Sequence, residues 1–296
     1  MMFNRSNRLK DCAFGFSASV LLLLCATLPQ RANAQITNPN VLIKGLGGPA
    51  GYGYATSKLN HDLEPGEHTP DPLTLPFPLF GSRMFFFVNP NGTVTIAPFR
   101  SYTPEPFPVS NYNYPIIAPY WADVDTRCED CGTVYVGYPN EKTIVVTWDQ
   151  VGYYNQHSDK TNTFQVVLRD RRQDFKGGYL DIEFRYAGLN WTTGDASGGS
   201  NGLGGTPALA GFDAGDGINL WVLPGSFSSS ILNLVNGSNL IDPVPGIWSY
   251  SMRQTPQVVP EPFTIFGVST ALGFGSFFKR TVSKKQEKKS KISTPV

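Results

Sequence analysis

Residues 180–186 alternate strictly between apolar and charged side chains, and this period of two constrains the fold more than any other feature. The apolar positions are Leu180, Ile182, Phe184 and Tyr186, and the charged positions are Asp181, Glu183 and Arg185. Successive side chains of a β-strand point to opposite faces of a sheet, so we expect one face in a core and one in water. Similar alternation predicts strands at residues 133–138 and 143–148.

Turn residues between the apolar segments predict antiparallel hairpins. Pro90-Asn91-Gly92 separates residues 84–88 from 93–97, and Asn-Gly tolerates the positive φ that a tight turn demands. The segments 133–138 and 143–148 flank a second turn. Further pairs are predicted at residues 162–169 with 179–186, and at 209–212 with 220–223. Several short antiparallel strands at this spacing favour an all-β fold, an antiparallel β-sandwich.

The first 34 residues have the pattern of a secretory signal peptide. Three basic residues precede a mostly apolar stretch, residues 13–28. Ala32 and Ala34 supply the small-x-small pattern before a cut ahead of Gln35. We therefore expect an N-terminal signal helix that is removed on export, and an uncleaved membrane anchor is the alternative.

The C-terminal region combines a short motif, an apolar run and a basic tail. Residues 263–278 carry no charge, and their length of 16 lies near the short limit of roughly 17–25 for a membrane-spanning helix. Seven basic residues and one acid follow, which predicts that the tail, residues 279–296, stays cytoplasmic. We expect a single membrane-spanning helix at residues 263–278, with everything before it facing outward.

Pro260-Glu261-Pro262 lies at the boundary of this apolar run. The order of tripeptide, apolar span and basic stop over residues 259–291 resembles the PEP-CTERM sorting signal of Gram-negative bacteria. The resemblance implies that an exosortase, a membrane-embedded cysteine protease, cuts near the motif and releases or transfers the protein to the envelope. A plain tail anchor is the alternative.

Removal of both ends changes the charge balance of the chain. Residues 35–262 keep 13 basic and 21 acidic residues, so the exported part has a formal charge of −8. Nucleic-acid binding depends on basic residues that neutralise phosphates, so this composition argues against it. The length of the exported part is enough for one large or two small domains.

Cys128 and Cys131 are the two cysteines that remain after the signal peptide is removed. In an oxidising compartment, a disulfide that closes this small loop is the expected state. Reduced bystander thiols, a redox pair and a metal site stay open as alternatives. A redox pair normally opens a helix after a strand, whereas here a strand follows directly.

Seven short blocks between residues 75 and 225 form a recognisable series, namely residues 75–81, 87–95, 117–126, 145–148, 160–165, 191–194 and 210–212. In order and spacing they resemble the nidogen-like (NIDO) domain of extracellular proteins. The resemblance implies an extracellular module associated with matrix and cell adhesion, without catalytic activity. Trp121, Trp148 and Trp191 lie in these blocks and are first of all large core residues.

These patterns divide the chain into six parts. We expect a signal peptide (1–34), a Gly/Pro-rich lead-in to the β domain (35–74), a nidogen-like β domain (75–251), a Pro-containing spacer (252–262), the membrane-spanning part of the sorting signal (263–278) and a basic cytoplasmic tail (279–296).

Two oxygen-rich segments are weak candidates for a structural calcium site. Clustered carboxylate and carbonyl oxygens bind calcium. The first segment contains Asp123, Asp125, Glu129 and Asp130, although Arg127 among them favours an ion pair. The second contains Asp213, Asp216 and Asn219, without the spacing of an EF-hand. No other cofactor is indicated.

Together these features predict an exported, envelope-associated, non-catalytic protein for adhesion or extracellular-matrix assembly. Its expected partners are an exosortase-type protease, the membrane through residues 263–278, and a matrix glycan or surface protein, with no nucleic acid. The alternative is a calcium-assisted carbohydrate-binding module for exopolysaccharide. In that case exposed aromatic side chains would stack on sugar rings, and the candidates are Tyr112, Tyr114, Tyr153 and Tyr154.

Overall fold

The computed structural model describes residues 37–56, 72–80, 82, 85–174, 178–217 and 219–253. The predicted signal peptide, the sorting motif and both terminal helices lie outside these residues. The chain divides into two compact units, residues 1–170 with 181–250, and residues 171–180 with 251–296. Within the described part of the chain, no helix is both long and apolar enough to cross a membrane.

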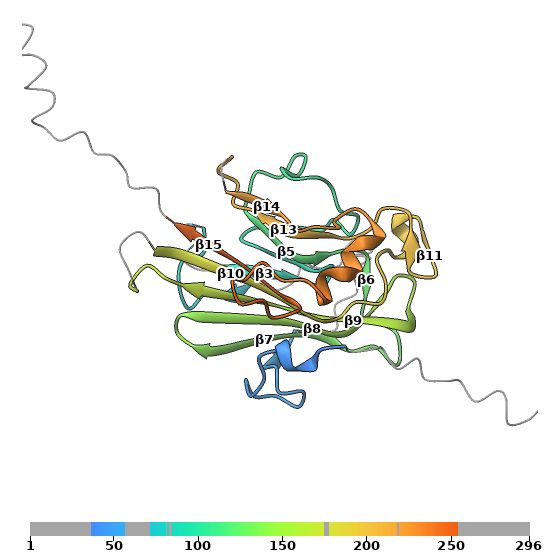
Figure 1. Cartoon of the computed structure of the whole chain (residues 1–296), viewed down its shortest axis with the longest axis horizontal. Helices are drawn as coiled ribbons and strands as arrows, with labels where there is room; N and C mark the ends of the chain where they lie inside the picture. Colours follow the sequence, from blue (N-terminus) through green and yellow to red (C-terminus); the bar gives the residue numbers. More distant parts are fainter. Residues whose placement is uncertain are drawn as a thin grey trace, which may run out of the picture. The chain divides into compact units, whose positions relative to one another are not determined.

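The larger sheet has seven strands in the order β1-β7-β8-β9-β10-β15, with β6 paired to β8 (Figure 1). Its strands are β1 (Tyr54–Ala55), β6 (Val124–Asp125), β7 (Thr133–Asn140), β8 (Thr143–Tyr153), β9 (His157–Asp170), β10 (Gly178–Gly188) and β15 (Ile247–Arg253). The long strands β8 and β9 pair antiparallel from Thr143↔Arg169 to Tyr153↔His157, and they form the middle of the sheet.

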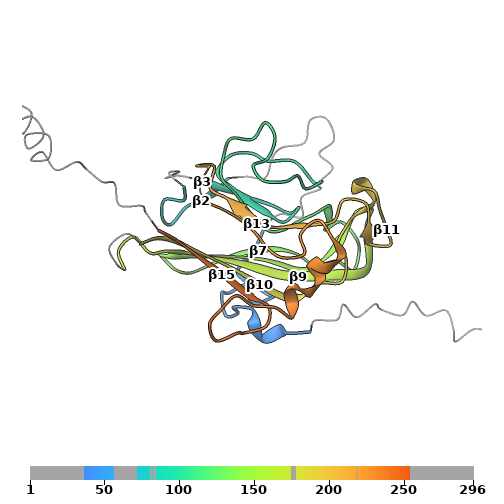
Figure 2. The ribbon, with the colours of Figure 1, turned by 45° about the horizontal axis from the view of Figure 1, so that its top comes forward.

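The smaller sheet has six strands in the order β14-β13-β5-β4-β3-β2. Its strands are β2 (Leu73–Thr74), β3 (Phe85–Asn89), β4 (Thr93–Thr95), β5 (Ile116–Trp121), β13 (Leu209–Asp213) and β14 (Leu220–Val222). The remaining elements are η1 (Pro39–Val41), η2 (Asp195–Ser197), η3 (Ser229–Val235) and the hairpin of β11 (Gly199–Ser200) with β12 (Leu203–Gly204). The two main sheets pack face to face, which confirms the prediction of an antiparallel β-sandwich (Figure 2).

Aromatic rings fill the space between the two sheets. Trp148 stacks on Phe164 with ring centroids 5.1 Å apart, and Tyr120 packs against Phe164 at 5.4 Å. Trp191 meets Tyr120 edge to face at 6.0 Å. All four side chains are fully buried, so the tryptophans of the core are placed as their size predicts.

The outer face of the larger sheet is covered by the lead-in, residues 37–55, drawn in blue in Figure 2. Gln165 holds it: its Oε1 accepts from Ile43 N at 3.0 Å, and its Nε2 donates to Ile43 O at 3.1 Å. Arg185 donates to Val41 O, and the side chains of Arg185 and Glu183 are only 16% and 14% exposed. The expectation that this face lies in water is therefore wrong, because a distant segment covers it.

The outer face of the smaller sheet is covered by the loop of residues 96–115. Phe99 and Val109 from this loop pack on Ile116, Ala118 and other buried residues of the sheet. Both faces of β5 are consequently buried, which explains why all six of its residues are inaccessible to water.

The hairpin predicted around Pro90-Asn91-Gly92 is confirmed, with Asn89 paired to Thr93. The second predicted hairpin is also present, although β8 continues to Tyr153 and β9 begins at His157. Seven of the described strands lie outside the predicted segments, namely β1, β2, β5, β6, β11, β12 and β15. β5 has no alternation because both of its faces are buried, and β15 extends to Arg253, inside the segment expected to be a spacer.

We predict that Gln165→Met lowers the free energy of unfolding by about 1–3 kcal/mol, because buried partners lose their hydrogen bonds while the side-chain volume is kept. Gln165 also donates to Thr147 Oγ1, at 2.7 Å. Chemical denaturation measures the loss, and hydrogen exchange of the Ile43 amide should become faster. Gln173→Met, at an exposed turn position, is the matched control and should change neither quantity. Equal effects of the two substitutions would contradict the role of Gln165.

Candidate functional site

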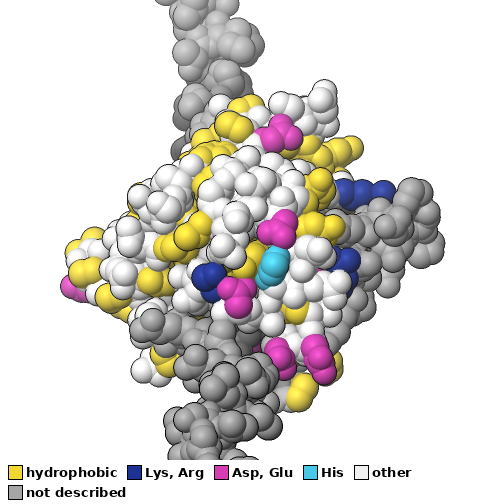
Figure 3. Space-filling view, turned by 90° about the vertical axis from the view of Figure 1, so that its right-hand side faces the viewer, with side chains coloured by type: hydrophobic (Ala, Val, Ile, Leu, Met, Phe, Trp, Pro, Cys, Tyr) yellow, Lys and Arg dark blue, Asp and Glu magenta, His cyan; other side chains and the backbone are white. Residues whose placement is uncertain are grey.

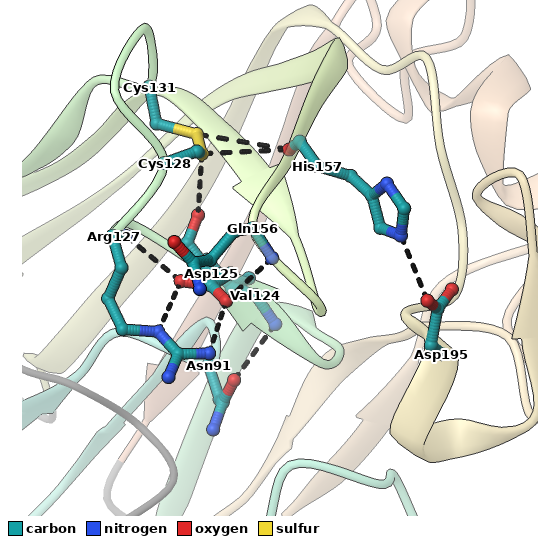
Figure 4. A network of polar contacts seen from close by, with 9 residues as sticks. All are labelled: Asn91, Val124, Asp125, Arg127, Cys128, Cys131, Gln156, His157 and Asp195. Carbon is teal, nitrogen blue, oxygen red and sulfur yellow. Dashed lines mark hydrogen bonds and ion pairs between the residues drawn. A yellow bond between two sulfur atoms is a disulfide. The ribbon is translucent and has the colours of Figure 1, made fainter.

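Four loops meet at one end of the sandwich, and we refer to them together as the loop end. They are the β3–β4 turn (90–92), the segment between β5 and β7 (122–132), the β8–β9 turn (154–156) and the loop after β10 (189–206). Figure 4 shows polar contacts that join these loops. Each loop follows a strand of the core, so the strand register fixes where the loop begins and ends.

The buried carboxylate of Asp125 is the centre of these contacts. Its Oδ1 accepts from Arg127 N at 2.9 Å and from Arg127 Nε at 2.8 Å. Its Oδ2 accepts from Arg127 Nη2 at 2.5 Å and from Gln156 N at 3.0 Å. Three of these hydrogen bonds lie within the 122–132 segment, and the fourth, from Gln156 N, links that segment to the β8–β9 turn.

Two opposing effects set the pKa of Asp125. Burial raises the pKa, whereas hydrogen bonds from the Arg127 side chain and from the backbone N–H groups of Arg127 and Gln156 lower it. The net pKa lies below the ordinary value of an aspartate. Asp125 is therefore ionised at neutral pH, and its charge is balanced by Arg127, which also lies over the ring of Tyr154 at 5.5 Å.

Asparagine side chains connect the β3–β4 turn to the same site. Asn91 Oδ1 accepts from Val124 N at 2.9 Å, and Asn89 Oδ1 accepts from Asn91 N at 3.1 Å. Gly92 has φ +80°, and a Cβ there would lie 1.8 Å from Tyr120 O. Only glycine fits this position, because it combines positive φ with close backbone contact.

A disulfide joins Cys128 to Cys131, with the two Cα atoms 5.2 Å apart. Both sulfurs face the carbonyl oxygen of His157, at 3.6 and 3.8 Å. Gly152 also borders the bond, since a Cβ there would lie 2.6 and 2.9 Å from the two sulfurs. The disulfide thus packs the 122–132 segment against the β8–β9 hairpin.

His157 provides an exposed polar group at the loop end. Its Nε2 lies 2.9 Å from Asp195 Oδ2, and the two side chains are 39% and 40% exposed. The ring stacks on Tyr153 at 4.5 Å, and the Tyr153 hydroxyl donates to Asp159 Oδ1 at 2.8 Å. Figure 3 shows this face, where acidic side chains lie around the histidine.

No local sequence pattern predicts the pairing of Asp195 with His157, because the two residues are 38 positions apart. A histidine paired with a carboxylate also occurs in nucleophilic sites, where a hydroxyl or thiol faces the second ring nitrogen. At this loop end the nearest sulfurs are joined in the disulfide, and they contact the backbone carbonyl of His157 rather than its ring. The arrangement offers hydrogen-bonding and charged groups for binding.

The first group of calcium candidates does not converge on one point. Asp125 is engaged by Arg127, while Asp123 is buried and its Oδ2 accepts from Ser197 N at 3.2 Å. Glu129 and Asp130 are exposed in the disulfide loop. Among the described residues, no group of three or more His, Cys, Asp or Glu side chains is placed to hold a metal ion.

The second group forms local turns. Asp213 Oδ1 accepts from Gly215 N at 2.8 Å, and Asp216 Oδ1 accepts from Asn219 N at 2.7 Å. Asn219 Nδ2 donates to Asp216 Oδ2 at 2.5 Å. Calcium binding at either segment remains a prediction. The processing residues Ala32, Ala34 and Gln35, and the motif residues Pro260, Glu261 and Pro262, lie outside the described residues.

We predict that Asp125→Asn lowers the free energy of unfolding at pH 7 by about 1–3 kcal/mol, because Arg127 and a backbone donor lose a charged acceptor. The depressed folded-state pKa of Asp125 stabilises the wild type above the unfolded pKa of about 3.9. This advantage is lost as pH falls through the folded-state pKa. Urea denaturation of both proteins from pH 7 to pH 2.5 measures it. Asp242→Asn, at an exposed position, is the control. The prediction is contradicted if the difference in unfolding free energy between the wild type and Asp125→Asn does not vary with pH.

The double variant Cys128→Ser with Cys131→Ser should lose about 2 kcal/mol of unfolding free energy, the loop-closure contribution of a loop this short. Dithiothreitol should lower the stability of the wild type by a similar amount and leave the double variant unchanged. Thermal or urea denaturation with and without the reductant measures both effects. A wild type that is insensitive to dithiothreitol, with free thiols by chemical titration, would show that no disulfide exists.

Sequence comparison identifies relatives of this chain among known proteins. The chain is 33% identical to alpha-tectorin of Homo sapiens over 219 residues, which cover 64% of this chain and 10% of that protein. It is 31% identical to nidogen of Drosophila melanogaster over 192 residues, which cover 56% of this chain and 13% of that protein. The chain thus spans little more than a tenth of the length of these relatives, and no solved structure matches it. The nidogen-like domain family matches residues 84–141 and 136–254, more than half of the chain, and the chain belongs to this family.

Proposed function

We propose that this protein is exported, stays associated with the cell envelope, and acts without catalysis in adhesion or extracellular-matrix assembly. Family membership is the observation that carries the proposal. Alpha-tectorin and nidogen, to which the chain is similar, are extracellular matrix proteins, which supports a location outside the cell.

The loop end is suited to contact with a partner. The Asp125 carboxylate and the disulfide hold its loops in place, so little conformational entropy is lost when a partner binds. Its exposed groups, His157 and Asp195 among them, offer both hydrogen bonds and charge to a matrix glycan or to a surface protein. The acidic balance of residues 35–262 argues against nucleic acid as the partner.

Sorting is proposed to proceed through the C-terminal segment. In this proposal, residues 263–278 hold the exported chain in the inner membrane, and an exosortase-type protease acts near Pro260-Glu261-Pro262. The product is either released or transferred to the envelope. Without this cut, the protein would remain a tethered surface protein.

The second candidate function is a carbohydrate-binding module, and a chelation experiment tests whether calcium assists it. The exposure of Tyr114 favours this function, since 52% of its surface is open to solvent. Two other tyrosines do not fit. Tyr153 is buried, and Tyr154 lies beside Arg127 at the loop end, so neither presents a free ring as expected.

We expect the protein recovered from the native host to have an intact mass that corresponds to a start at Gln35 and an end near Pro262. Alanine at all three motif positions, Pro260, Glu261 and Pro262, should leave the C-terminal segment in place and retain the protein in the membrane fraction. Intact mass spectrometry of washed cells, membranes and medium distinguishes these forms.

A deletion strain should show weaker surface attachment or biofilm formation, and expression of the wild-type chain should restore it. The same strain that expresses the chain without residues 1–34 is the control, because this protein should stay in the cytosol and fail to restore attachment. Cytosolic wild-type protein together with unchanged attachment would refute the proposed function.

A further inference from the structure

A continuous series of aromatic rings runs from the smaller sheet to the surface. Trp121 is fully buried and meets Phe99 edge to face, with ring centroids 5.1 Å apart. Phe99 packs on Tyr112 at 4.7 Å, and Tyr112 packs on Tyr114 at 5.5 Å. The Tyr112 hydroxyl donates to Ala97 O at 3.1 Å, which fixes the third ring. Tyr114 is therefore held from behind while its outer side remains open to solvent.

Unused hydrogen-bonding groups flank this ring. Asn111 and Asn113 are exposed, and within the described parts of the chain their side-chain amides have no hydrogen-bond partner. They alternate with the two tyrosines along the 96–115 loop. We call Asn111, Tyr112, Asn113 and Tyr114 the tyrosine platform.

The turn after β13 lies beside the platform. A Cβ on Gly215 would lie 3.3 Å from Pro115 N and 3.4 Å from Tyr114 C, so the two backbones are in contact range. Asp213, at the start of this turn, pairs with Ile116, two residues after Tyr114. The exposed carboxylate of Asp216 belongs to the same turn. The surroundings of Tyr114 therefore supply amide donors, amide acceptors and carboxylate acceptors.

This combination matches the chemistry of a sugar ring. A pyranose has one face lined by C–H groups, which packs on an aromatic ring, and a rim of hydroxyls that both donate and accept hydrogen bonds. An asparagine amide supplies both a donor and an acceptor, whereas a carboxylate only accepts.

We propose that the tyrosine platform binds a pyranose unit of a neutral extracellular polysaccharide, with Tyr114 stacked on the sugar ring and Asn111 and Asn113 bonded to its hydroxyls. This inference rests on the proposed extracellular function, because the polysaccharide is met outside the cell. It narrows the carbohydrate ligand to neutral polysaccharides and assigns it to a defined site, the tyrosine platform.

A basic side chain from a protein partner is the competing occupant, since a cation also packs on an aromatic face. Lysine and arginine are donors only, so they leave the amide N–H groups of Asn111 and Asn113 without an acceptor. A sugar hydroxyl uses both halves of each amide. The two exposed amides therefore favour the sugar.

The test is affinity electrophoresis of the purified protein in native gels that contain dextran, hydroxyethylcellulose or galactomannan, each over a range of concentrations. We expect at least one of these polysaccharides to retard the wild type. Tyr114→Ala should raise the dissociation constant about tenfold, and Asn113→Ala about threefold or more. Tyr114→Phe should stay close to wild type, because the ring is kept.

Tyr54→Ala is the matched control, since Tyr54 is 78% exposed but lies on β1 of the other sheet. It should bind as the wild type does. The proposal is overturned if no polysaccharide retards the wild type, or if Tyr54→Ala weakens binding as much as Tyr114→Ala. It is also overturned if the wild type binds polylysine in a salt-sensitive manner and no polysaccharide. None of these results would alter the intact-mass and attachment measurements, so the proposed extracellular function can fail or stand separately.

Discussion

Each buried aromatic side chain that carries a polar atom must find a hydrogen-bond acceptor inside the protein, and the rest of this structure depends on how that requirement is met. Trp148 Nε1 donates to Pro90 O at 2.9 Å, and Trp191 Nε1 donates to Val151 O at 3.1 Å. Tyr120 and Tyr186 donate to the carbonyls of Trp191 and Pro119. Pro90 and Trp191 lie in loops, Val151 lies near the end of β8 and Pro119 lies within β5, so these hydrogen bonds fix core packing and loop placement together.

Buried polar side chains on the outer face of the larger sheet also need hydrogen-bond partners, and the lead-in that covers this face supplies them. Gln165 and Arg185 point away from the core, and both bond to backbone atoms of the lead-in. A polar side chain on the outer face of a sheet is thus no sign of contact with water when a segment more than a hundred residues away can supply the partner. β5 lies inside the smaller sheet and both of its faces are buried. Its sequence therefore shows no alternation of apolar and polar residues.

The structure shows which features are local enough in the chain to be predicted from the sequence. Alternation and Asn-Gly turns are local, so the β3–β4 and β7–β8 hairpins and the sandwich class follow from the sequence. His157 and Asp195 are 38 residues apart, and Gln165 and Ile43 are 122 residues apart. No local sequence pattern predicts either contact. The acidic cluster at residues 123–130 is evident in the sequence, but its density alone does not show that Asp125 pairs with Arg127 and that Asp123 accepts from a backbone N–H.

The position of β5 bears on the two surfaces for which binding is proposed. The tyrosine platform precedes the first residue of this strand, Ile116, and the loop end follows its last residue, Trp121. β5 is buried on both faces, and the 96–115 loop that carries the platform also contacts the loop end, where Thr103 Oγ1 lies 2.8 Å from Ser197 Oγ, so both surfaces are fixed to the same rigid strand. A protein that assembles a matrix must contact more than one partner. If both proposals hold, β5 connects two binding surfaces within one β-sandwich, as the proposed matrix role requires.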